Sequence, residues 1–321
     1  MGKSEGINAR IVGLGKAVPD HIVTNADLEK QIDTTNEWIV SRTGIRERRI
    51  LSSDSGLDAS DLGTQAARQA LAMSKLEPQD LDMIICASFT PDKVFPSTAC
   101  LIQQKLKASR AGAFDVQAAC SGFVYGLSIA DGFIRSGQCK NILVLGSEII
   151  SKVINWKDRS TCVLFGDGAG AVVVSAEQGK AGVLATYLGA DGNYGSLLEM
   201  ELWREPRTIK MNGSEIFKQA VRSMGDAALT VIDRAGLKPE DVDLLIPHQA
   251  NIRIIEATTK RLKLDPQKVF VNIDKYGNTS AASIPIALQE AHEQGRIKAG
   301  QIIVLVAFGG GLTWGAVAMR W

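Results

Sequence analysis

Residues 76–85 form the stretch LEPQDLDMII, and residues 237–246 form a near copy of it, LKPEDVDLLI. Five of the ten positions are identical, and each copy follows an alanine-rich amphipathic segment and runs into an apolar strand. The spacing between the copies, from 76 to 237, also matches the apolar strands at 142–145 and 303–306 and the helical segments before them. One match would fit any common helix–proline–strand unit, whereas three matches at one spacing favour two related halves.

Each half alternates helical segments with continuous strands rich in Val, Ile and Leu. Such strands are buried on both faces, as in α/β proteins with a largely parallel sheet. The sequence therefore predicts an α/β fold of duplicated halves, with an N-terminal half at residues 1–175 and a C-terminal half at 176–321. Because ligand sites in such sheets lie beyond the carboxyl ends of the strands, equivalent strand ends of the two halves are expected to meet at one cleft.

The composition excludes several classes of protein. The chain has 321 residues, of which 45% are hydrophobic and 22% charged, and a net charge of +1. This balance produces no field that would attract nucleic acid or an anionic membrane, and no apolar run approaches the roughly 18 residues of a membrane span. Five cysteines without CxxC spacing fit a reducing cytoplasm and argue against a disulfide framework or a zinc site. We therefore expect a cytoplasmic protein without a metal, nucleic-acid or membrane partner.

Cys120 stands between a predicted strand, residues 113–116, and a predicted helix that begins near Phe123. The free N–H groups and the dipole of a helix N-terminus favour a thiolate, so this is a suitable position for a nucleophile. The structural alternative is an inert buried cysteine.

Three further polar or flexible sites follow predicted strands or precede predicted helices. His248 comes directly after a strand, Asn278 lies just before the second half's counterpart of the Cys120 helix, and residues 308–311 (FGGG) end the last strand of the duplication. Glycines allow backbone N–H groups to approach a ligand closely, as in an oxyanion hole. Each feature alone also fits a structural role: a core histidine, a turn asparagine or a tight turn.

Together, six motifs resemble those of the β-ketoacyl-[acyl-carrier-protein] synthase III family, the initiating condensing enzymes of bacterial type II fatty acid synthesis. They are WIVSRTGI (38–45), ACSG (119–122), FGDGAG (165–170), PHQAN (247–251), YGNTSAAS (276–283) and AFGGG (307–311). The resemblance covers essentially the whole chain. It implies a thiolase-like fold of five layers, αβαβα, and a cytoplasmic homodimer.

The resemblance also implies a catalytic triad of Cys120, His248 and Asn278. In the expected ping-pong reaction, Cys120 takes the acyl group of a short acyl-CoA, malonyl-[acyl-carrier protein] loses CO₂, and the resulting carbanion attacks the acyl-cysteine to give a 3-ketoacyl-carrier protein. His248 and Asn278 are expected to stabilise the enolate, and the backbone N–H groups of Cys120 and Gly310 to form a second oxyanion hole. CoA thioesters are substrates here, and no metal or redox cofactor is implied.

The remaining residues that the resemblance assigns are binding residues. They are Trp38, Arg42, Arg159 and Asn251 for CoA and its pantetheine arm, Gln249 and Arg253 for the acidic acyl carrier protein, and Phe95 and Phe308 for the acyl pocket. Trp38 and Arg159 are expected to hold the adenine between them. Phe95 is expected to reach across the dimer and close the partner's pocket, so that primer length depends on the dimer.

Other functions stay open at this point. A synthase that primes a polyketide or other secondary pathway shares the triad, and acetyl, propionyl and branched primers all fit. A cysteine hydrolase of thioesters would need His248 as a base for Cys120, and the duplication and the glycine loop disfavour it. A non-catalytic scaffold is disfavoured by the intact triad. The lack of any cysteine after Cys162 separates the chain from thiolases.

Overall fold

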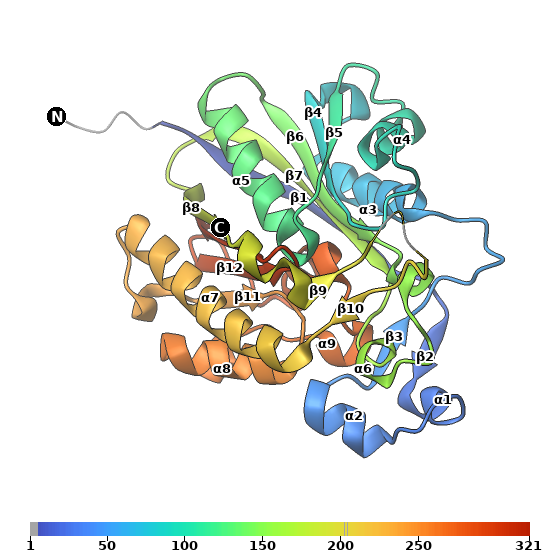
Figure 1. Ribbon diagram of the computed structural model, residues 1–321. Coiled ribbons are helices and arrows are strands. Elements are labelled where there is room, and N and C mark those ends of the chain that lie inside the picture. The colour runs from blue at the N-terminus through green and yellow to red at the C-terminus, as the bar shows by residue number, and fades with distance from the viewer. Residues whose placement is uncertain (1–5, 202, 204) are drawn as a thin grey trace.

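The computed structural model describes residues 6–201, 203 and 205–321, and it contains two main β-sheets (Figure 1). The first sheet has the strand order β1 (Ile7–Ala17), β7 (Gly168–Gln178), β6 (Asn141–Glu148), β4 (Met83–Ala87), β5 (Gly112–Val116). The second has the order β8 (Gly182–Ala190), β13 (Thr313–Arg320), β12 (Ile302–Gly309), β11 (Leu244–Pro247).

The two sheets have matching topologies, as the duplication predicts. In the first sheet β4 and β6 are parallel and β7 and β1 are antiparallel to their neighbours, and β11, β12, β13 and β8 repeat this pattern. The carboxylates of Asp82 and Asp243 make the same contact in each half, accepting the N–H of Asn141 at 3.0 Å and of Ile302 at 2.8 Å. Where the first half has its fifth strand, the described part of the second half has a parallel bridge between Leu245 and Val269.

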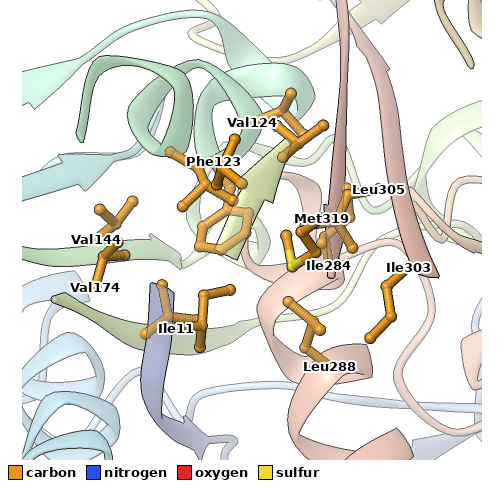
Figure 2. Packing of buried hydrophobic residues seen from close by; sticks show 14 of the residues in the cluster. Ile11, Phe123, Val124, Val144, Val174, Ile284, Leu288, Ile303, Leu305 and Met319 are labelled. Carbon is orange, nitrogen blue, oxygen red and sulfur yellow. The ribbon is translucent and has the colours of Figure 1, made fainter. Parts of the chain in front are cut away.

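The main helices form three layers around the two sheets, which confirms the predicted αβαβα arrangement. They are α3 (Ala59–Ser74) and α4 (Thr98–Leu106) outside the first sheet, α5 (Gly122–Arg135) and α10 (Ser283–Glu293) between the sheets, and α7 (Gly213–Arg234) and α8 (Ile252–Leu262) outside the second. Figure 2 shows the central core, where side chains of α5 and α10 pack with both sheets. Its labelled residues are Ile11, Phe123, Val124, Val144, Val174, Ile284, Leu288, Ile303, Leu305 and Met319.

The chain passes from the first sheet to the second at residues 179–181. The expected boundary after residue 175 falls inside β7, because pairing with β1 continues beyond the apolar run, as far as Gln178 opposite Ile7. An ion pair between Arg10 and Glu177, at 2.6 Å, lies in this polar extension. The apolar run of β7 thus ends before the strand itself does, so the change to polar residues did not mark the end of β7.

Shorter elements form a lobe beside the second sheet's helices (Figure 1). They are β2 (Ile22–Thr24), α1 (Asn25–Glu29), α2 (Asn36–Thr43), β3 (Glu47–Arg49), α6 (Arg159–Cys162), β9 (Leu198–Glu199), β10 (Lys210–Met211) and α9 (Ile273–Tyr276). The fully buried Arg48 ties this lobe together by donating to the carbonyls of Val23 and Val163 and to the side chain of Asn25. No helix within the described ranges is both long enough and apolar enough to cross a membrane.

Candidate active site

The structure brings Cys120, His248 and Asn278 together in the wall of one cavity of about 510 Å³. Phe308 and Gly310, at the end of β12, line the same cavity. The first half contributes the thiol, and the second half contributes the imidazole, the carboxamide and the glycine loop. The carboxyl ends of strands from both halves therefore meet at one cleft.

Cys120 lies in a 3₁₀ turn, Ala119–Ser121, that leads directly into α5. Gly309 of β12 approaches this turn so closely that a Cβ there would lie 2.7 Å from the Cys120 nitrogen. The thiol is buried, and burial raises its pKa to about 12. The expected preference for thiolate is therefore outweighed by desolvation, and in this state Cys120 holds its proton at neutral pH.

His248 follows β11 and is held by two contacts. Its backbone N–H donates to the Val306 carbonyl at 2.8 Å, and its Nδ1 lies 2.7 Å from the Ser283 hydroxyl. That hydroxyl oxygen also accepts the N–H of Gln249 at 3.4 Å, so we assign the hydroxyl hydrogen to Nδ1 and the ring proton to Nε2. Burial lowers the pKa of the imidazole to about 3, so the ring is neutral at physiological pH. His248 thus offers a neutral N–H donor.

Asn278 is fixed by its own backbone and by the following turn. Its N–H donates to the Leu164 carbonyl at 2.8 Å, and its carbonyl accepts the N–H of Gly166 at 3.1 Å. The side-chain Oδ1 accepts the N–H of Ser280 at 2.8 Å. Because the oxygen of the carboxamide is used in this way, its Nδ2 remains as the donor for the cavity. The cavity therefore contains two neutral donors near a buried thiol.

The residues predicted for CoA form two groups. The guanidinium groups of Arg42 and Arg159 each lie 4.9 Å from the centroid of the Trp38 ring, and Arg159 also donates to the Asp33 carbonyl at 2.8 Å. An adenine between Trp38 and Arg159 would require this guanidinium to move away from the indole. Asn251 lies separately, in the wall of the main cavity, where its side chain caps α8.

The prediction that Gln249 contacts a carrier protein is wrong. Its side chain is 1% exposed, and its polar atoms are used inside the protein. The Nε2 donates to the carbonyls of Pro247 at 2.8 Å and Phe270 at 3.2 Å, and the Oε1 accepts the N–H of Asn272 at 3.0 Å. Gln249 was assigned to the site because it follows His248 in the sequence. In the structure the backbone after β11 directs the Gln249 side chain into the protein interior.

Arg253 and Phe95 are both on the surface. Arg253, in the first turn of α8, is exposed, and its guanidinium lies 5.5 Å from the ring centroid of Phe217, which lines the cavity, so Arg253 lies beside the cavity wall. Phe95 is 84% exposed and is absent from the lining of its own subunit's cavity. Its predicted place in a partner's acyl pocket stays a prediction.

Sequence reasoning missed most of the apolar wall of the cavity, for which no motif gave a signal. This wall includes Leu198, Met200, Ile209, Met211, Ile216, Phe217, Ala220 and Met224, from α7 and the strands and loops before it. It also missed Ser283 and Glu148. A glutamate at the carboxyl end of a strand with an apolar centre is a signal that would have found Glu148.

Comparisons with known proteins show which family the chain resembles over its length. Two family models match, "3-Oxoacyl-[acyl-carrier-protein (ACP)] synthase III" at residues 114–192 and its C-terminal counterpart at residues 232–321. A β-ketoacyl-[acyl-carrier-protein] synthase III of Caldanaerobacter subterraneus is 54% identical over 99% of both chains.

Solved structures give the same result. The structure of a 3-oxoacyl-[acyl-carrier-protein] synthase III from Aquifex aeolicus matches with a TM-score of 0.94 and 54% sequence identity. The match covers 98% of this chain and 100% of the Aquifex chain. A priming β-ketosynthase of a polyketide pathway is 34% identical, with a TM-score of 0.92 over 100% of this chain and 98% of that one.

Proposed function

The chain belongs to the β-ketoacyl-[acyl-carrier-protein] synthase III family, and we propose that Cys120, His248 and Asn278 carry out this family's reaction in the cavity that they line. The enzyme is an acyltransferase that condenses a short acyl-CoA with malonyl-[acyl-carrier protein], releasing CoA and CO₂, and so initiates fatty acid synthesis. The observation that carries the assignment of residues is the meeting of one buried thiol with two neutral donors in a single cavity.

In the first half-reaction the Cys120 sulfur attacks the thioester carbonyl of acyl-CoA. The carbonyl oxygen then becomes negative, and the backbone N–H groups of Cys120 and Gly310 are the proposed donors to it. Gly309 supports this role because its lack of a side chain allows β12 to approach the Cys120 amide. The acyl group remains on sulfur as CoA leaves.

In the second half-reaction malonyl-carrier protein loses CO₂, and negative charge develops on its thioester oxygen. The Nε2–H of His248 and the Nδ2 of Asn278 are the proposed donors to this enolate, and such donors are each worth about 3–4 kcal/mol in other enzymes. The enolate carbon then attacks the acyl-cysteine. This chemistry needs no metal or redox cofactor, because the loss of CO₂ itself supplies the carbanion.

The state of His248 also separates this function from a cysteine hydrolase. A hydrolase would use the imidazole as a base for Cys120, but a ring whose pKa lies near 3 binds a proton weakly. A neutral ring that donates from Nε2 suits the stabilisation of an enolate. The polyketide alternative has less support, because the priming ketosynthase is 34% identical to this chain, whereas two relatives named β-ketoacyl- or 3-oxoacyl-[acyl-carrier-protein] synthase III are 54% identical to it.

The substrates are proposed to enter past Trp38 and along the apolar wall. Arg42 and Arg159 would meet CoA phosphates, Asn251 would contact the pantetheine arm, and Phe308 would face the acyl group. The exposed Arg253 beside the cavity wall, with the exposed Lys260 on the same helix, would attract an acidic carrier protein, and this attraction should weaken with salt.

We further propose that the enzyme works as a homodimer in the cytoplasm. β5 is an edge strand of the first sheet and is only half-buried, and the nearby Val94 and Phe95 are apolar and largely exposed, which suits a second copy of the chain. The five cysteines are free thiols, as a reducing compartment allows.

The test uses acyl-CoAs of different chain lengths and the intact mass of the protein. Wild type should gain one acyl group per chain, and Cys120→Ala should gain none. His248→Ala and Asn278→Ala should still be acylated, while their release of CO₂ from malonyl-carrier protein should fall by about 10²–10³-fold. Acylation of Cys120→Ala, or normal CO₂ release by both other variants, would refute the assignment.

A further inference from the structure

A second titratable group, Glu148, lies behind the nucleophile at the carboxyl end of β6. Its carboxylate is fully buried and accepts the N–H groups of Phe89 at 3.2 Å and Thr90 at 3.1 Å. It also accepts the hydroxyls of Ser88 at 3.1 Å and Thr90 at 2.6 Å. Glu148 forms no ion pair with any residue that the structure describes. This is an unusual amount of burial for a carboxylate without a cation.

Ser280 belongs to a short turn that packs between β6 and the turn of Cys120. Its 3₁₀ turn, Ser280–Ala282, contacts β6 so closely that a Cβ on Gly146 would lie 2.3 Å from the Ala281 carbonyl oxygen. On the other side, a Cβ on Gly122 would lie 3.7 Å from the Cβ of Ala281. The Ser280 hydroxyl is buried and completes no hydrogen bond of standard geometry with the described residues. The turn that carries it contacts both β6, which ends at Glu148, and the 3₁₀ turn of Cys120, and the hydroxyl also lowers the pKa of the Cys120 thiol and of the Glu148 carboxyl.

The proposed reaction requires an acceptor for the Cys120 proton. The thiol has a pKa of about 12 because it is buried, and the neutral ring of His248 is a poor base with a pKa near 3. Burial raises the pKa of Glu148 to about 7, where a carboxylate can both take and return a proton. The other titratable groups facing this region are Cys86 of β4 and, beyond it, the carboxyls of Asp92 and Asp115. Burial raises the pKa of the Cys86 thiol well above its usual value, so this thiol is no acceptor for the proton.

We propose that Ser280 relays the thiol proton of Cys120 to Glu148 during acylation, and that Glu148 holds this proton until condensation releases Cys120. This inference rests on the proposed function and adds to it the place where the proton stays between the two half-reactions.

The proton balance closes over the full cycle. In acylation the Cys120 sulfur forms a bond to the acyl carbon, its proton moves to the Ser280 oxygen, and the hydroxyl proton of Ser280 moves to Glu148. The bond to CoA breaks, and CoA leaves as a thiolate that takes a proton from water. In condensation, CO₂ leaves the malonyl group, the enolate carbon bonds to the acyl carbon, and the Cys120–acyl bond breaks. The Cys120 thiolate then regains its proton from Glu148 through Ser280.

The decisive variant is Glu148→Gln, because the relay and plain electrostatics predict opposite effects. The negative charge of Glu148 raises the pKa of Cys120, so its removal alone would make the thiol more acidic and faster to react. The relay instead predicts that acylation by acetyl-CoA in a single turnover slows by about 10²-fold at pH 7, as expected for loss of a general base. The wild-type rate should rise with pH through an apparent pKa near 7, and this rise should vanish in the variant. Acylation as fast as wild type, or faster, would overturn the relay.

Ser280→Ala tests the other member of the relay, and it also serves if Glu148→Gln does not fold. Alanine tolerates this backbone conformation, because Ala119 has a φ of 45° at the equivalent position of the first half and Ser280 has a φ of 51°. The matched control is Thr279→Val, which removes the neighbouring hydroxyl and keeps the shape of the side chain. Like that of Ser280, the Thr279 hydroxyl is buried and has no hydrogen-bond partner among the described residues. Ser280→Ala should lose the rise with pH and slow to a similar extent, and Thr279→Val should stay within about twofold of wild type. A normal pH profile in Ser280→Ala would overturn the relay.

Alkylation of Cys120 by iodoacetamide separates this inference from the proposed function, because it needs no acyl-CoA. If wild type is acylated but both relay variants alkylate and acylate normally, the relay alone is refuted. If acyl-CoA does not modify wild type but alkylation is slow in both variants, the proposed function fails and the proton path stands.

Discussion

At the scale of single residues, burial sets the ionisation of this site. It raises the pKa of Cys120 and Glu148 and lowers that of His248, so all three groups shift toward their neutral forms. The sequence predicted the identity and position of Cys120 and His248 from strand ends and a helix start. It did not predict their protonation, because the helix N-terminus and burial act on the thiol in opposite directions and only the folded structure shows which is larger.

Ser283 should control decarboxylation by fixing the tautomer of His248. Ser283→Ala removes the hydroxyl that holds Nδ1, and the loss of one such hydrogen bond, about 1–1.5 kcal/mol, corresponds to a roughly tenfold lower rate of CO₂ release. Acylation of Cys120 should change by less than about twofold. Intact mass measures the rate of acylation, and CO₂ capture measures the rate of decarboxylation, on the same sample. Equal losses in the two half-reactions would show a general structural effect instead.

His248 should also make stability depend on pH. Its pKa is about 3 in the folded protein and near 6.5 in an unfolded chain, so between these values only the unfolded chain takes up a proton, and stability falls as the pH is lowered through this window. At pH 5 the loss should be about 2 kcal/mol relative to pH 7.5. Urea unfolding of wild type and His248→Asn at both pH values measures it, since the variant should lack this share of the loss.

The control is His21→Asn, which replaces an exposed histidine and should keep the wild-type dependence on pH. Identical dependence in wild type and His248→Asn would mean that burial of the imidazole does not affect stability in this way.

At the scale of elements, close backbone contacts rather than motifs fix the site. The sequence correctly predicted the strands before Cys120 and His248 and the helices after Cys120 and Asn278. It did not predict that Gln249 turns inward or that β7 continues to Gln178, because both depend on partners far along the chain, Asn272 and the start of β1.

Two glycine-to-alanine changes should have opposite effects. Gly146, buried in β6, has no room for a Cβ, because the Ala281 carbonyl lies 2.3 Å from its position, so Gly146→Ala should destabilise by about 1–3 kcal/mol. Gly132 is exposed in α5 and a Cβ there would meet nothing within 4 Å, so Gly132→Ala should stabilise by about 0.5–1 kcal/mol. Urea unfolding compares the two, and a shift of the same sign in both would contradict the packing argument. Gly146→Ala should also slow acylation, because the displaced turn carries Ser280.

At the scale of the whole molecule, the two halves are similar in topology and unequal in role. The half with five strands provides the nucleophile and the proposed proton store, and the half with four strands provides the donors. The additional strand, β5, lies at the edge of the first sheet, and the segment with Phe95 lies between β4 and α4, which pack on β5. Phe95 is largely exposed and does not line the described cavity, which is compatible with the proposal that it acts on a second subunit.

Phe95→Ala should therefore lengthen the acyl chains that the enzyme accepts. If Phe95 closes the partner's acyl pocket, its truncation leaves space for additional methylene groups, each worth about 0.8 kcal/mol when buried. Intact mass after incubation with acyl-CoAs of increasing length would then show longer acyl groups on Cys120.

Subunit mixing decides whether the effect crosses the dimer. In a mixed dimer of Phe95→Ala and Cys120→Ala subunits, the intact Cys120 faces a partner that retains Phe95, so it should regain the wild-type chain-length limit. An altered limit that persists in the mixed dimer would place the effect within one subunit and contradict the exchange of Phe95.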